Sequence, residues 1–307
     1  MPKNLARPNF LIAGAGESGT SWLYACLLQH PQVYMPKEMR PEPHFFYKQV
    51  EYDKGLDYYL ERYFNDVPSS ANAIGERSSS YIFGETVAPR IHEVFPDMKF
   101  IIMLREPVER AYSNWRFTVQ SGLEWRSFES AIAAESARIR NEKNLFWREI
   151  KPYAYLARSE YGPQIRTFFD IFPAKNILIL NSDLVKKDEA EALRQVCRFL
   201  EVDEIQNYQA PGTFPTSSVR SKILQFGLRR YFGREFDRLI ESSRLKNAST
   251  LEVAKNPFLS LLRLNQTQAH PKLDPETKKR LEKHFAESNR ILKPYISWDP
   301  ENWHGQP

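Results

Sequence analysis

A run of small and hydroxyl-bearing residues near the amino terminus has the composition of an anion-binding loop. Three glycines follow a short apolar run, namely Gly14, Gly16 and Gly19. Thr20 and Ser21 come directly after the last of them. Glycine allows the tight turns of such a loop, and the backbone N–H groups at the start of a helix attract phosphate oxygens. The loop therefore predicts a phosphate site, with a plain structural turn as the alternative. The predicted contacts are Gly16, Glu17, Ser18, Gly19, Thr20, Ser21 and Trp22.

The loop lacks the lysine of the common nucleotide-binding motif. In G-x-x-x-x-G-K-[ST] a lysine follows the second glycine, and Thr20 stands at that position here. This departure counts against an ordinary nucleotide kinase. A kinase that depends on Mg-ATP is kept as the alternative enzyme.

A second cationic position, Arg105, directly follows the apolar run 99–104. That run predicts a buried parallel strand, and ligands of open α/β sheets bind at the carboxyl ends of the strands. An arginine there can bind a phosphate through two forked hydrogen bonds. The alternative is a surface ion pair with Glu106 or Glu109.

The elements that must position these residues alternate along the chain. Apolar runs separated by amphipathic helical patterns predict an α/β fold with a parallel central sheet flanked by helices. No repeat or clear linker divides the chain, so we expect a single domain over 1–307, with 203–270 as a variable insertion on the acceptor side. The expected strands are 9–13, 73–75, 99–104 and 176–180, and the expected helices are 22–29, 55–64, 85–95, 107–122, 127–140, 160–172, 189–200, 221–239 and 274–294.

Two segments together resemble the donor-binding motifs of PAPS-dependent sulfotransferases, where PAPS is 3′-phosphoadenylyl sulfate. The stretch GAGESGTSWL at 14–23 resembles their 5′-phosphosulfate loop, and FIIMLREPVERAYS at 100–113 resembles their 3′-phosphate segment. EPHFF at 42–46 and GERS at 75–78 have counterparts in the bacterial and heparan sulfate-type branches. Two motifs in the right order are more specific than one. The resemblance implies a P-loop-like sulfotransferase fold.

The resemblance also implies how the donor is held. Ser113 would share the 3′-phosphate with Arg105, and Arg220 would reach the same phosphate unless it only begins a solvated helix. Tyr161 would line the site, with core packing as the alternative. The donor would be PAPS, its product would be phosphoadenosine phosphate (PAP), and no metal would be required.

Two residues are implied as the base of the reaction. Glu76 matches the carboxylate that glycan-type members use, and His44 competes because other branches use histidine. Sulfuryl transfer by in-line attack needs a group that takes the proton of the acceptor hydroxyl or amine. The alternatives are an ion pair between Glu76 and Arg77, and a histidine without a catalytic role.

The chain departs from the family pattern at Glu17, where members usually carry lysine or arginine. A carboxylate there repels an anionic donor. Glu17 could turn outward while Lys37, Arg40 or Arg77 supplies the positive charge, or it could contact a cationic acceptor. As a third explanation, the chain binds PAP but is impaired in catalysis.

Composition limits the remaining classes of function. The 43 Lys+Arg and 38 Asp+Glu give a formal net charge of +5, which fits an anionic ligand and is too small to predict nucleic-acid binding. Cys26 and Cys197 are expected to be buried free thiols. No apolar run is long enough for a signal peptide or a membrane span. We therefore expect a cytoplasmic, bacterial-type enzyme of secondary metabolism that acts on a small metabolite, lipid or saccharide.

Overall fold

The computed structural model describes residues 5–37, 42–143, 149–205, 208–209, 218–233, 236, 256–269 and 271–304. The chain divides into two compact units. We call the first the sheet unit; it comprises Met1–Arg110, Arg158–Thr213 and Lys283–Pro307. The second unit comprises Ala111–Ala157 and Phe214–Glu282.

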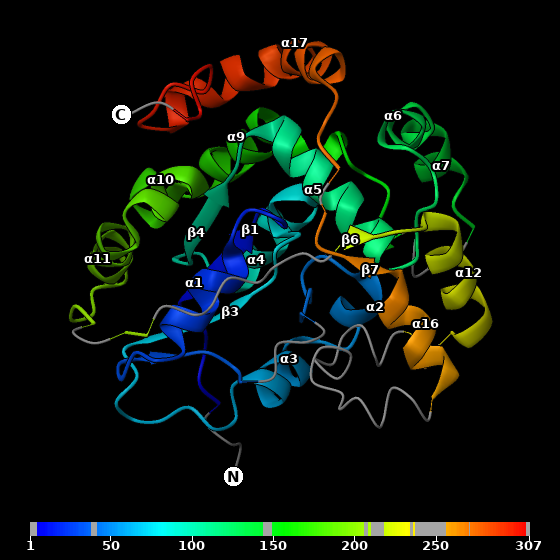
Figure 1. The fold of residues 1–307 in the computed structure, drawn as a ribbon. Helices are drawn as coiled ribbons and strands as arrows, with labels where there is room; N and C mark the ends of the chain where they lie inside the picture. Colours follow the sequence, from blue (N-terminus) through cyan, green and yellow to red (C-terminus); the bar gives the residue numbers. More distant parts are fainter. Residues whose placement is uncertain are drawn as a thin grey trace. The chain divides into compact units, whose positions relative to one another are not determined.

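A five-stranded parallel sheet forms the centre of the sheet unit, in the order β2-β3-β1-β4-β5 (Figure 1). Its central strand pair is β1 and β4, and five of the six residues of β4 are buried, as a parallel strand covered on both faces requires. The predicted parallel α/β fold is therefore confirmed. The strands are β1 (Phe10–Gly14), β2 (Val33–Tyr34), β3 (Ala73–Arg77), β4 (Lys99–Leu104) and β5 (Ile177–Asn181).

Helices cover both faces of this sheet. Successive residues of a strand point to opposite faces, so Phe100 packs with α3, α4 and α9 in one apolar cluster while Ile101 packs with α1 and α11 in another. The helices of the sheet unit are α1 (Thr20–Leu27), α2 (Gln49–Tyr52), α3 (Leu56–Tyr63), α4 (Val87–Val94), α9 (Tyr161–Ile171), α10 (Ser182–Lys187) and α11 (Glu189–Leu200).

The carboxyl ends of β1 and β4 lie where the strand order reverses. From β1 the chain continues to β2 and β3 on one side, and from β4 it continues to β5 on the other. Open α/β sheets bind their ligands at this position. The loop after β1 lies against β4 there, because the Ala15 N–H donates to the Met103 carbonyl at 2.8 Å.

The second unit is built around helices and one short hairpin. Helices α12 and α16 lie side by side, and the antiparallel strands β6 and β7 join the start of one to the end of the other (Figure 1). Its elements are α6 (Phe128–Ala133), α7 (Glu135–Asn141), β6 (Ser218–Val219), α12 (Lys222–Phe232), α16 (Pro257–Asn265) and β7 (Gln266–Thr267). Two helices, α5 (Pro107–Gln120) and α17 (Pro275–Leu292), have residues in both units.

Two sequence-based element predictions were wrong. The helix predicted at 127–140 is two helices, α6 and α7, and Ser127 caps α6 by accepting the Ser130 N–H. At the break, the buried carboxylate of Glu135, the first residue of α7, accepts two backbone N–H groups from 156–157. Strand β3 continues beyond Gly75, so Glu76 and Arg77 lie within it rather than after it.

Other element predictions are confirmed or fall partly outside the described residues. The strand at 99–104 and the helix at 189–200 have the predicted bounds. Helix α12 ends at Phe232, and the rest of the helix predicted to 239 lies mostly outside the described residues. Cys26 and Cys197 are buried and free, as expected, and burial raises the pKa of Cys26 to about 12. None of the described helices is both long and apolar enough to cross a membrane.

Candidate active site

The predicted phosphate loop connects β1 to α1 and ends in an open helix terminus. Its backbone adopts left-handed conformations at Glu17 (φ 69°) and Gly19 (φ 95°). Gly19 precedes α1 without a side-chain cap, so the N–H groups of Thr20 and Ser21 have no acceptor within the helix. A helix terminus of this kind attracts anions through its N–H groups and its dipole. The predicted residues from Gly16 to Trp22 thus form the end of this loop and the first residues of α1.

A buried guanidinium lies beside this loop. Arg77, at the end of β3, is 6% exposed, and its Nη1 donates to Ser21 Oγ at 2.8 Å. The same nitrogen lies 3.0 Å from Glu42 Oε1. Of the three cations that could replace the missing lysine, Arg77 therefore contacts the loop, Lys37 is exposed, and Arg40 lies outside the described residues.

Glu42 is the carboxylate at the centre of this network. Its Oε2 accepts hydrogen bonds from the Ser79 N–H (2.7 Å) and hydroxyl (2.8 Å), and lies 3.3 Å from His44 Nε2. Burial alone would raise the pKa of Glu42, but the electrostatic interactions with His44 and Arg77 and the hydrogen bonds from Ser79 outweigh it and lower that pKa. Glu42 is therefore ionised at neutral pH. Our sequence analysis did not single it out, although it begins the EPHFF segment.

His44 is held in a constrained position next to Glu42. Its backbone is left-handed (φ 49°), and its N–H donates to Ser78 Oγ at 2.8 Å. Burial lowers the pKa of His44 to about 4, with Glu42 opposing and Lys48 and Arg158 adding to the effect. The imidazole is therefore neutral at neutral pH, and one of its nitrogens can accept a proton.

Glu76 is enclosed by hydroxyl groups on the other face of β3. Its carboxylate is 0% exposed and accepts hydrogen bonds from Tyr81 (2.7 Å), Ser78 (2.9 Å) and Tyr59 (3.3 Å). Burial raises the pKa of Glu76 to about 7 against these hydrogen bonds. The ion pair with Arg77 that the sequence offered as an alternative is wrong, because neighbouring strand residues point to opposite faces and Arg77 pairs with Glu42.

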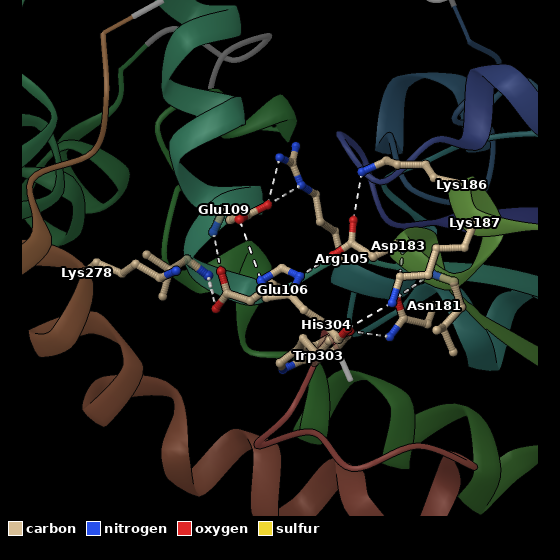
Figure 2. A network of polar contacts seen from close by, with 12 residues as sticks. Arg105, Glu106, Glu109, Asn181, Asp183, Lys186, Lys187, Lys278, Trp303 and His304 are labelled. Carbon is tan, nitrogen blue, oxygen red and sulfur yellow. Dashed lines mark hydrogen bonds and ion pairs between the residues drawn. The ribbon is translucent and has the colours of Figure 1, made fainter. Parts of the chain in front are cut away.

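Arg105 lies at the carboxyl end of β4 in a network of polar contacts (Figure 2). Its Nε and Nη2 donate to Glu109 Oε2 at 3.3 and 3.0 Å, which is the ion pair named above as an alternative. His304 Nε2 lies 3.7 Å from Glu109 Oε1, and His304 Nδ1 lies 3.0 Å from Asp183 Oδ2. Because both members of the Arg105–Glu109 pair are partly exposed, the pair is weak enough for a phosphate to compete with it.

Three predicted donor contacts lie farther along the chain. Tyr161 begins α9 and is fully buried; burial raises its pKa to about 12, while the nearby Ser18 side chain and Arg105 backbone moderate the rise. Ser113 is buried on α5, in the second unit. Arg220 is also in the second unit, where its Nε donates to the Gln266 carbonyl at 3.2 Å. Their roles toward the donor stay predictions.

Comparison with known proteins identifies the family. A sequence model described as "Sulfotransferase domain" matches residues 7–290. The chain belongs to the sulfotransferase domain family. A sulfotransferase from Alicyclobacillus acidocaldarius has the same fold: its crystal structure aligns over 98% of this chain and 100% of its own, with a TM-score of 0.70 and 24% identity.

The curated sulfotransferase relatives are much longer proteins. The bifunctional heparan sulfate N-deacetylase/N-sulfotransferase 4 of Mus musculus is 25% identical over 234 residues, which cover 74% of this chain and 26% of the relative. The corresponding enzyme 3 of Homo sapiens is 26% identical over 215 residues, covering 67% and 24%. The chain thus spans about a quarter of the length of these relatives.

Proposed function

We propose that this sulfotransferase-family chain transfers a sulfuryl group from PAPS to a hydroxyl or amine and releases PAP. The observation that carries the proposal is the convergence of the open α1 terminus with the buried guanidinium of Arg77, at the point where the strand order reverses. Together they offer backbone N–H groups, a hydroxyl and a fixed positive charge to an anion. These donors fit a phosphosulfate group.

Each part of the donor would meet different residues. The N–H groups of Thr20 and Ser21 and the guanidinium of Arg77 would hold the phosphosulfate group. Arg105 would bind the 3′-phosphate once it exchanges Glu109 for the ligand. The donor supplies the sulfuryl group, and the chain supplies charge, orientation and a base.

We propose Glu42 as the base, in place of Glu76 or His44 acting alone. A base must reach the acceptor, and the fully buried Glu76 has no surface on which to do so. Glu42 is ionised, partly exposed and joined to the loop through Arg77. In the reaction Glu42 takes the proton of the acceptor, the acceptor oxygen or nitrogen forms a bond to sulfur, and the bond from sulfur to the phosphate oxygen of the donor breaks.

The acceptor is proposed by class only. The sequence favours a small metabolite, lipid or saccharide, and the names of the mouse and human relatives add amines of a sulfated glycan to that range. A cytoplasmic location stays a prediction from the sequence.

The test of this function begins with donor binding. Calorimetric titration with PAP should give saturable binding at one site per chain, and ATP with Mg²⁺ should not compete with it. The purified chain should then transfer ³⁵S from labelled PAPS to members of a panel of amino sugars, phenols and long-chain alcohols. Absence of PAP binding, or phosphate transfer from ATP without any response to PAPS, would overturn the proposal.

The choice of base has its own test. Glu42→Gln should lower kcat by about 10²- to 10⁴-fold, because the base is lost, and should not weaken PAP binding, because the negative charge paired with Arg77 is removed. Glu76→Gln is the matched control, since it neutralises a buried carboxyl next to Arg77 in β3, and it should change kcat by less than about tenfold. The assignment is wrong if the two variants exchange these effects.

A further inference from the structure

The two helices packed beside the β6–β7 hairpin of the second unit concentrate positive charge. The described segments 218–233 and 256–269 contain no Asp or Glu. Their local charge of +5 equals the formal net charge of the whole chain. The cations are Arg220, Lys222, Arg229, Arg230 and Arg263.

Helix α12 carries an exposed apolar face among these cations. Ile223 and Tyr231 are 72% and 85% exposed, and Leu224 is exposed as well. With Arg230 and Gly227, which faces open space, they occupy about a third of the helix circumference. The opposite face of α12 contributes Leu228 and Phe232 to the packing against α16.

Helix α16 continues this surface. Leu264 is 71% exposed, Leu261 is also exposed, and Arg263 lies between them in the sequence. Asn265 at the end of α16 hydrogen-bonds to the backbone of Ser221 at the start of α12. Helices α12 and α16 lie side by side (Figure 1), so the exposed leucines of α16 belong to the same helix pair as the exposed apolar residues of α12. We call this set the α12–α16 surface: Ile223, Leu224, Arg230, Tyr231, Leu261, Arg263 and Leu264.

We propose that the α12–α16 surface docks on a membrane that contains anionic lipids. Helices whose apolar side chains are exposed beside Lys and Arg suit the boundary between lipid headgroups and acyl chains. A second copy of the chain is disfavoured, because a two-fold interface would bring two copies of this cation-bearing surface together with no acidic residue in either described segment to pair with. An anionic lipid surface instead complements both the charge and the apolar residues. Such docking would hold the chain where lipid acceptors are present.

The experiment is vesicle flotation of the full chain without donor. We expect binding to phosphatidylcholine vesicles that contain phosphatidylglycerol, little binding to phosphatidylcholine alone, and weakening by high salt. The variant I223E/L264E should bind at least about tenfold more weakly, because two apolar side chains no longer insert. R230Q/R263Q should lose about fivefold for each charge removed. The control V50E alters an exposed apolar residue of the sheet unit and should bind like the wild type.

Circular dichroism melting and PAP titration are the controls for folding and for the donor site. We expect both to be unchanged in the variants. Because flotation uses no donor, its failure and a failure of the proposed sulfuryl transfer are distinguishable. Equal binding to both vesicle types, or undiminished binding of I223E/L264E, overturns the proposal. Two other results would also overturn it. One is sedimentation in which I223E/L264E turns a dimer into a monomer, and the other is binding of a DNA oligonucleotide without any binding to vesicles.

Discussion

Glu17 and Arg77 contribute opposite charges to the phosphate loop, and Glu42 is paired with Arg77. Glu17 occupies a left-handed position in the loop, where sulfotransferases usually carry a basic residue, and Arg77 contacts the same loop from β3. The positive charge thus comes from a strand rather than from the loop itself. This placement supports the first of the three explanations for Glu17, in which a neighbouring cation substitutes for the lysine.

Glu17→Lys should tighten PAP binding by about tenfold, because it replaces a repulsive charge with an attractive one at a partly exposed position. Calorimetric titration at constant salt measures the change. Glu17→Gln removes only the repulsion and should fall between the wild type and the lysine variant. Unchanged or weaker binding by both variants would show that Glu17 does not face the donor.

Glu109 competes with the donor for Arg105. Glu109→Gln should tighten PAP binding by a few fold, since an exposed ion pair of up to about 1 kcal/mol no longer has to break. Glu287→Gln is the control, because Glu287 forms a similar exposed pair with Arg290 on α17. If Glu109→Gln instead weakens PAP binding, Glu109 orients Arg105 rather than competing with it.

Part of the site could be predicted from residue types and part could not. Glycines, hydroxyls and an arginine after an apolar run are visible in the sequence, and the structure brings the loop and Arg105 to one edge of the sheet. The contact between Arg77 and Glu42 was not predictable, because it joins β3 to a loop 35 residues earlier through side chains alone. The buried carboxylate of Glu76 is satisfied by three hydroxyl partners, which were not predicted from the sequence.

At the scale of elements, α9 and α17 approach each other closely in the sheet unit. A Cβ added to Gly162 would lie 2.2 Å from the Ser288 carbonyl oxygen, and the Gly162 N–H donates to Ser288 Oγ at 3.0 Å. Gly162→Ala should therefore destabilise the protein by about 1–3 kcal/mol, as overpacking does. Urea denaturation measures this loss.

Gly227→Ala provides the matched control, because Gly227 is also helical but its added Cβ would meet nothing within 4 Å. Alanine favours a helix by up to about 1 kcal/mol over glycine, so this variant should be neutral or more stable. Equal destabilisation by both substitutions would mean that packing against α17 is not the cause.

Elements with strong local patterns were predictable, and those defined by distant contacts were not. The apolar run KFIIML at 99–104 predicted the bounds of β4, and the amphipathic pattern at 189–200 predicted those of α11. At the break between α6 and α7, Glu135 bonds to backbone groups more than 20 residues away. The two-residue strands β2, β6 and β7 are too short for alternation to appear in the sequence.

At the scale of the whole molecule, two buried groups make stability depend on pH in opposite directions. Glu76 has a raised pKa of about 7, so the folded state loses stability as pH rises from about 4.5 to 7. His44 has a lowered pKa of about 4, so the folded state loses stability as pH falls from about 6.5 to 4. Between about 4.5 and 6.5 the two effects oppose each other.

Single substitutions should expose each effect. Between about pH 4.5 and 6.5, the free energy of unfolding of Glu76→Gln should rise with pH by about 1 kcal/mol per pH unit. That of His44→Asn should fall with pH by a similar amount. Asparagine tolerates the left-handed backbone at this position. Urea denaturation at a series of pH values measures both slopes. Slopes of the same sign in the two variants would contradict this account.

The alternation of side chains along β3 limits how this region of the chain can vary in length. Glu76 faces the tyrosine-lined core while Arg77 faces α1 and Glu42, because consecutive strand residues alternate. Inserting or deleting a single residue before Glu76 would exchange the two side chains, placing a guanidinium among the tyrosines and a carboxyl against the phosphate loop. Related chains that keep this chemistry should therefore tolerate length changes in the turn before β3 but not single-residue insertions or deletions within 73–77.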